Sequence, residues 1–149
     1  MREQMTCPKR LWVVFAADWQ MTDPVLQGAT ILVLDDDVLI NTAVGDVLRD
    51  AGCTVASCTS LREAWAAIDR ERFAGAVLDF DLGRRQTSYE VAGALEEAGV
   101  PIVFLTGYLR WAIPARWSRH IICRKPCLPD ELRQALREAM AHSARDKIP

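Results

Sequence analysis

The chain has 149 residues, of which half are hydrophobic, and its formal net charge is −2. This length suits one domain with a short appendage, and the nearly balanced charge provides no general attraction for nucleic acid. The hydrophobic content is sufficient for one packed core and excludes wholesale disorder.

Residues 1–29 differ from the rest and are expected to form an N-terminal extension. Its apolar run, from Leu11 to Trp19, is too short to span a bilayer and contains Asp18, so we predict no membrane anchor. The basic flank of this run faintly resembles a signal peptide. Three other interpretations stay open: a disordered segment, a gene-model artefact with Met21 as the natural start, or an arm that packs on its own domain or on a partner.

Residues 30–142 alternate short β-branched runs with amphipathic segments of helical length. The expected strands are 31–34, 54–57, 75–79, 101–105 and 120–123. The expected helices cover 39–51, a segment opened by the Ser60–Glu63 capping box, 89–98, and a last helix from Pro129. The first helix is expected to bury Leu39, Ala43, Val44, Val47, Leu48 and Ala51. Five such βα units predict an open five-stranded parallel sheet with helices on both faces.

Polar residues follow four of these strands at their carboxyl ends, which share one edge of a parallel sheet. These residues are Asp35, Asp36 and Asp37, then Asp79 and Asp81, then Thr106, and finally Lys125 with Pro126. Several carboxylates this close repel one another unless a cation is present or their pKa values rise. Oxygen-only ligands suit Mg²⁺, and a lysine and a hydroxyl beside it can hold phosphoryl oxygens. The pattern therefore predicts a phosphoryl-transfer site.

From about residue 30 to residue 140 the chain resembles the receiver domain of bacterial two-component response regulators. The segments ILVLDDD, VLDFDLG, IVFLTG and RKP occur in that family's order and at its usual separations. The resemblance implies a flavodoxin-like (βα)5 fold with strand order 2-1-3-4-5. It also resembles the stand-alone members of the family, which have no attached output domain.

The resemblance implies a role for each matching residue. Asp79 would be the phosphoacceptor, taking a phosphoryl group from a phosphohistidine. Asp35 and Asp36 would hold Mg²⁺ together with the Asp79 carboxylate and the backbone carbonyl of Asp81.

On the other side of the same site, Thr106 would hydrogen-bond the phosphoryl group. Lys125 would pair with that group, next to a cis bond to Pro126. The side chains of Asp37 and Asp81 are assigned structural roles.

Two places depart from the family pattern. Ile122 stands where an aromatic residue usually switches rotamer, and Tyr108 is a candidate to replace it. Residues 109–117 stand where the family has its fourth helix, but Pro114 breaks helical propensity there, so this element is expected to be short or mobile. Trp111 and Trp117 fit either core packing or a partner surface.

The five cysteines form no CxxC pair, and we interpret them as buried or idle thiols of a cytoplasmic protein. The tail, residues 143–149, is too short for an output domain, and no helix shows a basic recognition face. The expected partners are a sensor histidine kinase or histidine phosphotransfer protein and a downstream protein target. No direct contact with nucleic acid or membrane is expected.

Three alternatives remain at this stage. The chain could act as a phosphate shuttle to a histidine phosphotransfer protein, which would use the same site. DFDLG also resembles the nucleophile motif of haloacid-dehalogenase-type phosphatases, although that motif normally ends the first strand rather than the third. The third alternative is a docking module that is never phosphorylated.

Overall fold

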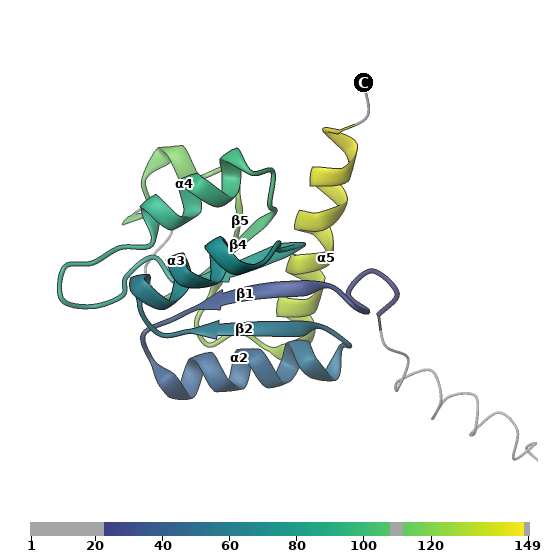
Figure 1. Ribbon diagram of the computed structural model, residues 1–149, viewed down its shortest axis with the longest axis horizontal. Coiled ribbons are helices and arrows are strands. Elements are labelled where there is room, and N and C mark those ends of the chain that lie inside the picture. Colours follow the sequence, from purple (N-terminus) through teal and green to yellow (C-terminus); the bar gives the residue numbers. More distant parts are fainter. Residues whose placement is uncertain (1–22, 108–111, 148–149) are drawn as a thin grey trace, which may run out of the picture.

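The structure, a computed structural model, describes residues 23–107 and 112–147, and they build a five-stranded parallel sheet in the order β2-β1-β3-β4-β5 (Figure 1). The strands are β1 (Thr30–Leu34), β2 (Thr54–Cys58), β3 (Gly75–Leu78), β4 (Ile102–Thr106) and β5 (Ile121–Arg124). The predicted fold class and strand order are therefore confirmed. Each of the five strands begins or ends one residue away from its predicted position.

Helices cover both faces of the sheet (Figure 1). They are α2 (Val38–Asp50), α3 (Leu61–Arg70), α4 (Tyr89–Glu97) and α5 (Pro129–Arg145). Because side chains alternate along a strand, Leu32, Leu78 and Phe104 pack under α3 and α4. Ile31 and Val77, on the opposite face of the sheet, pack under α2 and α5. The central strands are buried on both sides, as their continuous apolar runs predict.

The helices α2 and α3 begin with side-chain caps. The Asp37 side chain accepts hydrogen bonds from the N–H groups of Leu39 and Ile40, at 2.9 and 3.2 Å, and so starts α2. The predicted serine cap of α3 is present, since Ser60 Oγ accepts from the Glu63 N–H at 3.2 Å. The Glu63 carboxylate accepts from the N–H of Thr59 at 2.7 Å in place of the Ser60 N–H, so the predicted reciprocal box is only half formed. The prediction that Leu39 and Ala43 face the core was wrong, because Leu39 is 81% exposed and Ala43 is exposed as well.

The connection between β4 and β5 contains a short 3-10 helix, Ala115–Trp117, and no α-helix among its described residues. Pro114 precedes this turn and accepts a hydrogen bond from the Trp117 N–H at 2.9 Å. The expectation of a short element is thus confirmed. Trp117 is 1% exposed and belongs to the core, whereas Tyr108 and Trp111 lie outside the described residues.

The described part of the N-terminal extension, from Asp23 onward, packs on the domain. Leu26 is fully buried in the core under α2 and α5, and Asp23 forms an ion pair with Arg137 at 3.0 Å. The Gly28 N–H also donates to the carbonyl of Gly52 at 2.8 Å. These contacts tie residues 23–28 to the amino end of the sheet, opposite the polar edge.

Within the described residues, no helix has both the length and the apolar character needed to cross a lipid bilayer.

Candidate phosphoryl-transfer site

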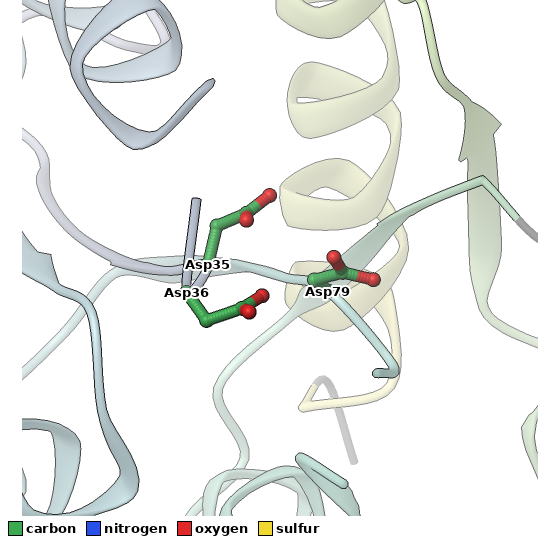
Figure 2. A group of neighbouring side chains, drawn as sticks. All are labelled: Asp35, Asp36 and Asp79. Carbon is green, nitrogen blue, oxygen red and sulfur yellow. The ribbon is translucent and has the colours of Figure 1, made fainter. Parts of the chain in front are cut away.

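The acidic residues predicted after β1 and β3 meet at the carboxyl edge of the sheet. Carboxylate oxygens of Asp35, Asp36 and Asp79 all lie within 4.8 Å of one another. Figure 2 shows Asp35 and Asp36 side by side where β1 ends, with the Asp79 carboxylate next to them at the end of β3. Asp35 and Asp79 are buried, whereas Asp36 is exposed, so the group opens to solvent on one side.

Lys125 brings the positive charge to this group. Its Nζ lies 2.6 Å from Asp35 Oδ2 and 2.6 Å from Asp79 Oδ2. The contact with Asp79 is a hydrogen bond, but the contact with Asp35 is an ion pair without hydrogen-bond geometry, which leaves the buried Asp35 Oδ2 with no hydrogen-bond partner. One ammonium group therefore balances the charge of two buried carboxylates, and the exposed carboxylate of Asp36 lies beside them.

This arrangement shifts the pKa values of both partners. Burial is the largest influence on the Asp79 carboxyl and raises its pKa. The Lys125 ammonium lowers this pKa, whereas the negative charge of Asp35 raises it. The net result is a raised pKa for Asp79. Burial lowers the pKa of Lys125, but the adjacent carboxylates of Asp35 and Asp79 outweigh this effect and leave the pKa raised. Lys125 is therefore held in its charged form.

The backbone fixes the positions of these side chains. The Asp37 N–H donates to Asp35 Oδ1 at 2.9 Å, and the Asp81 N–H is 3.3 Å from Asp79 Oδ1. Thr106 is buried at the end of β4, and its carbonyl accepts from the Lys125 N–H at 2.8 Å. The peptide bond between Lys125 and Pro126 is cis, as predicted.

The structure thus places every predicted site residue at the same edge of the sheet. The side chain of Asp81 accepts from the Gly83 N–H at 2.8 Å and supports the loop after β3. Asp37 caps α2, so its side chain has the structural role that was assigned to it. Ile122, at the place of the missing aromatic switch, is partly buried against the core under α3 and α4.

Asn41 supports the site, although it was not predicted as a site residue from the sequence. Its side-chain Nδ2 donates to the carbonyls of Cys58 at 2.7 Å and Asp35 at 3.3 Å, which ties the end of β1 to the end of β2. The residue is buried in a helix whose inward face is otherwise largely apolar. The available signal was a polar residue on the face of α2 that also carries Val44 and Leu48.

The two cysteines that flank the lysine are not activated thiols. Burial raises the pKa of Cys123, and burial together with the neighbouring Cys123 raises the pKa of Cys127 to about 12. Because the thiolate is the reactive form, both side chains are poor nucleophiles at neutral pH. This agrees with the interpretation of idle thiols.

The residues present fit a hard divalent cation such as Mg²⁺. All the available donors are oxygens, three carboxylates converge, and the buried Asp35 Oδ2 retains acceptor capacity that a cation would satisfy. Asp35, Asp36 and Asp79 are the side chains that would hold it.

A doubly wound sheet with an acidic group, a hydroxyl and a lysine at its carboxyl edge defines a class of phosphoryl-accepting signalling domains. The family model of the response regulator receiver domain matches residues 31–137, and the chain belongs to this family. Among curated protein sequences, none matches the chain.

Solved structures share this fold at low sequence identity. A response regulator receiver protein from Sinorhizobium medicae WSM419 is 24% identical, with a TM-score of 0.68, and the match covers 79% of this chain and 98% of that one. The response regulator TrrA from Thermotoga maritima, described in complex with Mg²⁺ and BeF, is 22% identical, with a TM-score of 0.65 and coverages of 74% and 98%. A response regulator from Burkholderia pseudomallei with a phosphorylated aspartic acid is 21% identical, with a TM-score of 0.66 and coverages of 80% and 72%.

Proposed function

We propose that this protein accepts a phosphoryl group on Asp79 from a sensor histidine kinase or a histidine phosphotransfer protein, and then signals by binding another protein. The observation that carries the proposal is the position of the Asp79 carboxylate. It is buried where β3 ends, lies 2.6 Å from Lys125 and shares a group of oxygens with Asp35 and Asp36.

The chemistry follows from these positions. An Asp79 oxygen attacks the phosphorus of a phosphohistidine, so that an O–P bond forms, the P–N bond breaks, and the leaving imidazole nitrogen takes up a proton. Lys125 would pair with a phosphoryl oxygen, and the Thr106 hydroxyl would donate a hydrogen bond to another. Bound Mg²⁺ would supply the charge neutralisation that lets an anionic donor approach an acidic site.

Two of the similar structures support this assignment. TrrA is described with Mg²⁺ and BeF, and the Burkholderia protein is described with a phosphorylated aspartic acid. Each has the same fold as this chain, and the residues of this chain meet the chemical requirements of the same reaction. We extend the acceptor role to Asp79 on that basis.

We place the protein in the cytoplasm, with residues 30–142 as its receiver domain, residues 1–29 as an N-terminal extension and residues 143–149 as a tail. The proposed output of the receiver domain is binding to another protein. The surface built from the 3-10 turn, β5 and α5 is the proposed contact face, because it adjoins both Thr106 and Lys125 in the chain. Transfer of the phosphoryl group onward to a histidine phosphotransfer protein is the second candidate, since it uses the same site.

The other two alternatives have less support. Membership of the receiver family and the place of DFDLG after the third strand weigh against a haloacid-dehalogenase-like phosphatase. The presence of the acidic group, the hydroxyl and the lysine together weighs against a docking module that is never phosphorylated.

Beryllofluoride, an analogue of the phosphoryl group, is expected to stabilise the parent protein when Mg²⁺ is present. A ligand at about 100 times its Kd adds about 2.7 kcal/mol, which corresponds to a rise in Tm of about 5–10 °C for a chain of this size. The measurement is thermal unfolding with each component alone and with both. Asp36→Asn should lose most of the rise because it removes a cation ligand.

Asp37→Asn is the matched control for that variant. Asn caps a helix as well as Asp does, so this neighbouring substitution should keep the full response. Equal responses in Asp36→Asn and Asp37→Asn would contradict the assignment of the cation ligands. Thr106→Ser should also respond more strongly than Thr106→Ala, because only serine keeps the hydroxyl.

A further inference from the structure

The loop between β3 and α4 contains an unusual run of left-handed backbone. Gly83, Arg84 and Arg85 have φ values of 72°, 51° and 61° in succession. Glycine adopts this region freely, but a residue with a Cβ is strained there. Two consecutive arginines in this conformation are an outlier of the kind that occurs at functional sites.

Hydrogen bonds on both sides hold this strained turn. The Leu82 N–H donates to the carbonyl of Gln86 at 3.0 Å, and the Gln86 N–H donates to the carbonyl of Gly83 at 2.9 Å. Leu82 itself is buried in the core under α3 and α4, which anchors the base of the loop. The turn is therefore a fixed feature of the loop.

The turn starts in contact with the acidic group. A Cβ at Gly83 would lie 3.1 Å from Asp36 Oδ2, so the loop backbone passes directly against that carboxylate. Adjacent Cα atoms are about 3.8 Å apart, which places the backbones of Arg84 and Arg85 within about 8 Å of Gly83. In Figure 1 this loop extends beyond the carboxyl ends of the strands.

The side chains of Arg84 and Arg85 are both exposed. Within residues 23–107 and 112–147, neither guanidinium group has an ion-pair or hydrogen-bond partner. The neighbouring carboxylates have Lys125 as their cation, and their net negative charge repels an incoming phosphoryl dianion. Positive charge at the rim of such a site attracts anions and raises their rate of association.

We propose that the Arg84–Arg85 turn is a recognition element for anionic phosphodonors, which it attracts to Asp79 through its positive charge. The shared chemistry is the phosphoryl anion, whether it is carried by a small acyl phosphate or by a phosphohistidine. This inference rests on the proposed function of Asp79.

The test compares initial rates of phosphorylation in Mg²⁺ for the parent, Arg84→Ala/Arg85→Ala and a control, Arg70→Ala/Arg72→Ala. The control removes two exposed arginines from the opposite end of the sheet, so the change in net charge is equal. With acetyl phosphate at about 20 mM ionic strength, the loop variant should react about three- to tenfold more slowly than the control. At about 500 mM the two rates should agree within about twofold, because salt screens the attraction.

Two further comparisons extend the test. Lysine and glycine variants distinguish the effect of charge from that of backbone conformation, and a second phosphodonor distinguishes the two types of donor. Arg84→Lys/Arg85→Lys should keep most of the rate, whereas Arg84→Gly/Arg85→Gly should be as slow as the alanine variant although it relieves the strain. Phosphoramidate has an N–P bond like phosphohistidine and less negative charge than acetyl phosphate, so it should show the same effect in smaller degree.

Equal rates for the loop variant and the control at low salt would overturn the inference, as would a loss that persists at high salt. A normal rate in the glycine variant would overturn it too, because the charge would then be irrelevant. If the parent itself takes up no phosphoryl group, the proposed function fails, and this inference fails with it.

Discussion

Lys125→Met is expected to lower the free energy of unfolding by about 2–4 kcal/mol near neutral pH. Methionine keeps the length of the apolar stem but removes the ammonium group that lies 2.6 Å from both Asp35 and Asp79. The two carboxylate side chains are only 4% and 9% exposed, so they would be left charged and buried without their cation. Urea unfolding in EDTA measures the change.

The pH dependence of this loss has a defined sign. Without Lys125 the Asp79 carboxyl favours its neutral form more strongly, and its part of the penalty disappears when it is protonated. The destabilisation by Lys125→Met should therefore be smaller at about pH 4.5 than at about pH 7.5. The free energy of unfolding of the double variant Asp79→Asn/Lys125→Met should be about 1–3 kcal/mol higher than the sum of the two single changes predicts. Equal losses at both pH values, or strictly additive changes, would show that the ion pairs do not have this role.

Asp79→Asn is expected to stabilise the protein by about 1–2 kcal/mol at about pH 8 in the absence of divalent cations. Its pKa in the folded state is raised above its ordinary value, chiefly by burial. A carboxyl of this kind contributes stability that is fully present below its unfolded pKa and is lost as the pH rises through its folded pKa. Asparagine does not titrate, so the advantage of the variant over the parent should grow from about pH 4 to about pH 8.

Asp69→Asn is the matched control for this prediction, because Asp69 is exposed on α3, away from the carboxyl edge. Its difference from the parent should stay within about 0.5 kcal/mol at every pH. An Asp79→Asn protein that is less stable than the parent at about pH 8 would mean that the ion pair with Lys125 outweighs the cost of burying the charge.

Much of this fold could be predicted from the sequence because the relevant signals are local. Periodicity and the geometry of parallel sheets were enough to predict the apolar strand runs and the helix starts at Ser60 and Pro129. They also placed the polar site residues after successive strands: Asp35, Asp79, Thr106 and Lys125. These features agree with one another, and the structure has them where they were expected.

The rest depends on tertiary contacts and on backbone angles that no local pattern specifies. Leu39 fits the helical period of α2, but it lies in the first turn, beyond the edge of the sheet, and is exposed. Asn41 is buried because two carbonyls from different strands meet its amide. The left-handed conformation of Arg84 and Arg85 opposes the preference of arginine and follows from hydrogen bonds across the loop.

The central claim is that Asp79 is a cation-dependent phosphoacceptor, and intact-mass spectrometry tests it most directly. The protein is incubated with acetyl phosphate, with Mg²⁺ or with EDTA, beside an Asp79→Ala variant whose folding is verified by circular dichroism. We expect the mass of one phosphoryl group on the parent with Mg²⁺, and none in EDTA or on the variant. A phosphoryl group on the folded Asp79→Ala protein, or no uptake by the parent from either acetyl phosphate or phosphoramidate, would contradict the account.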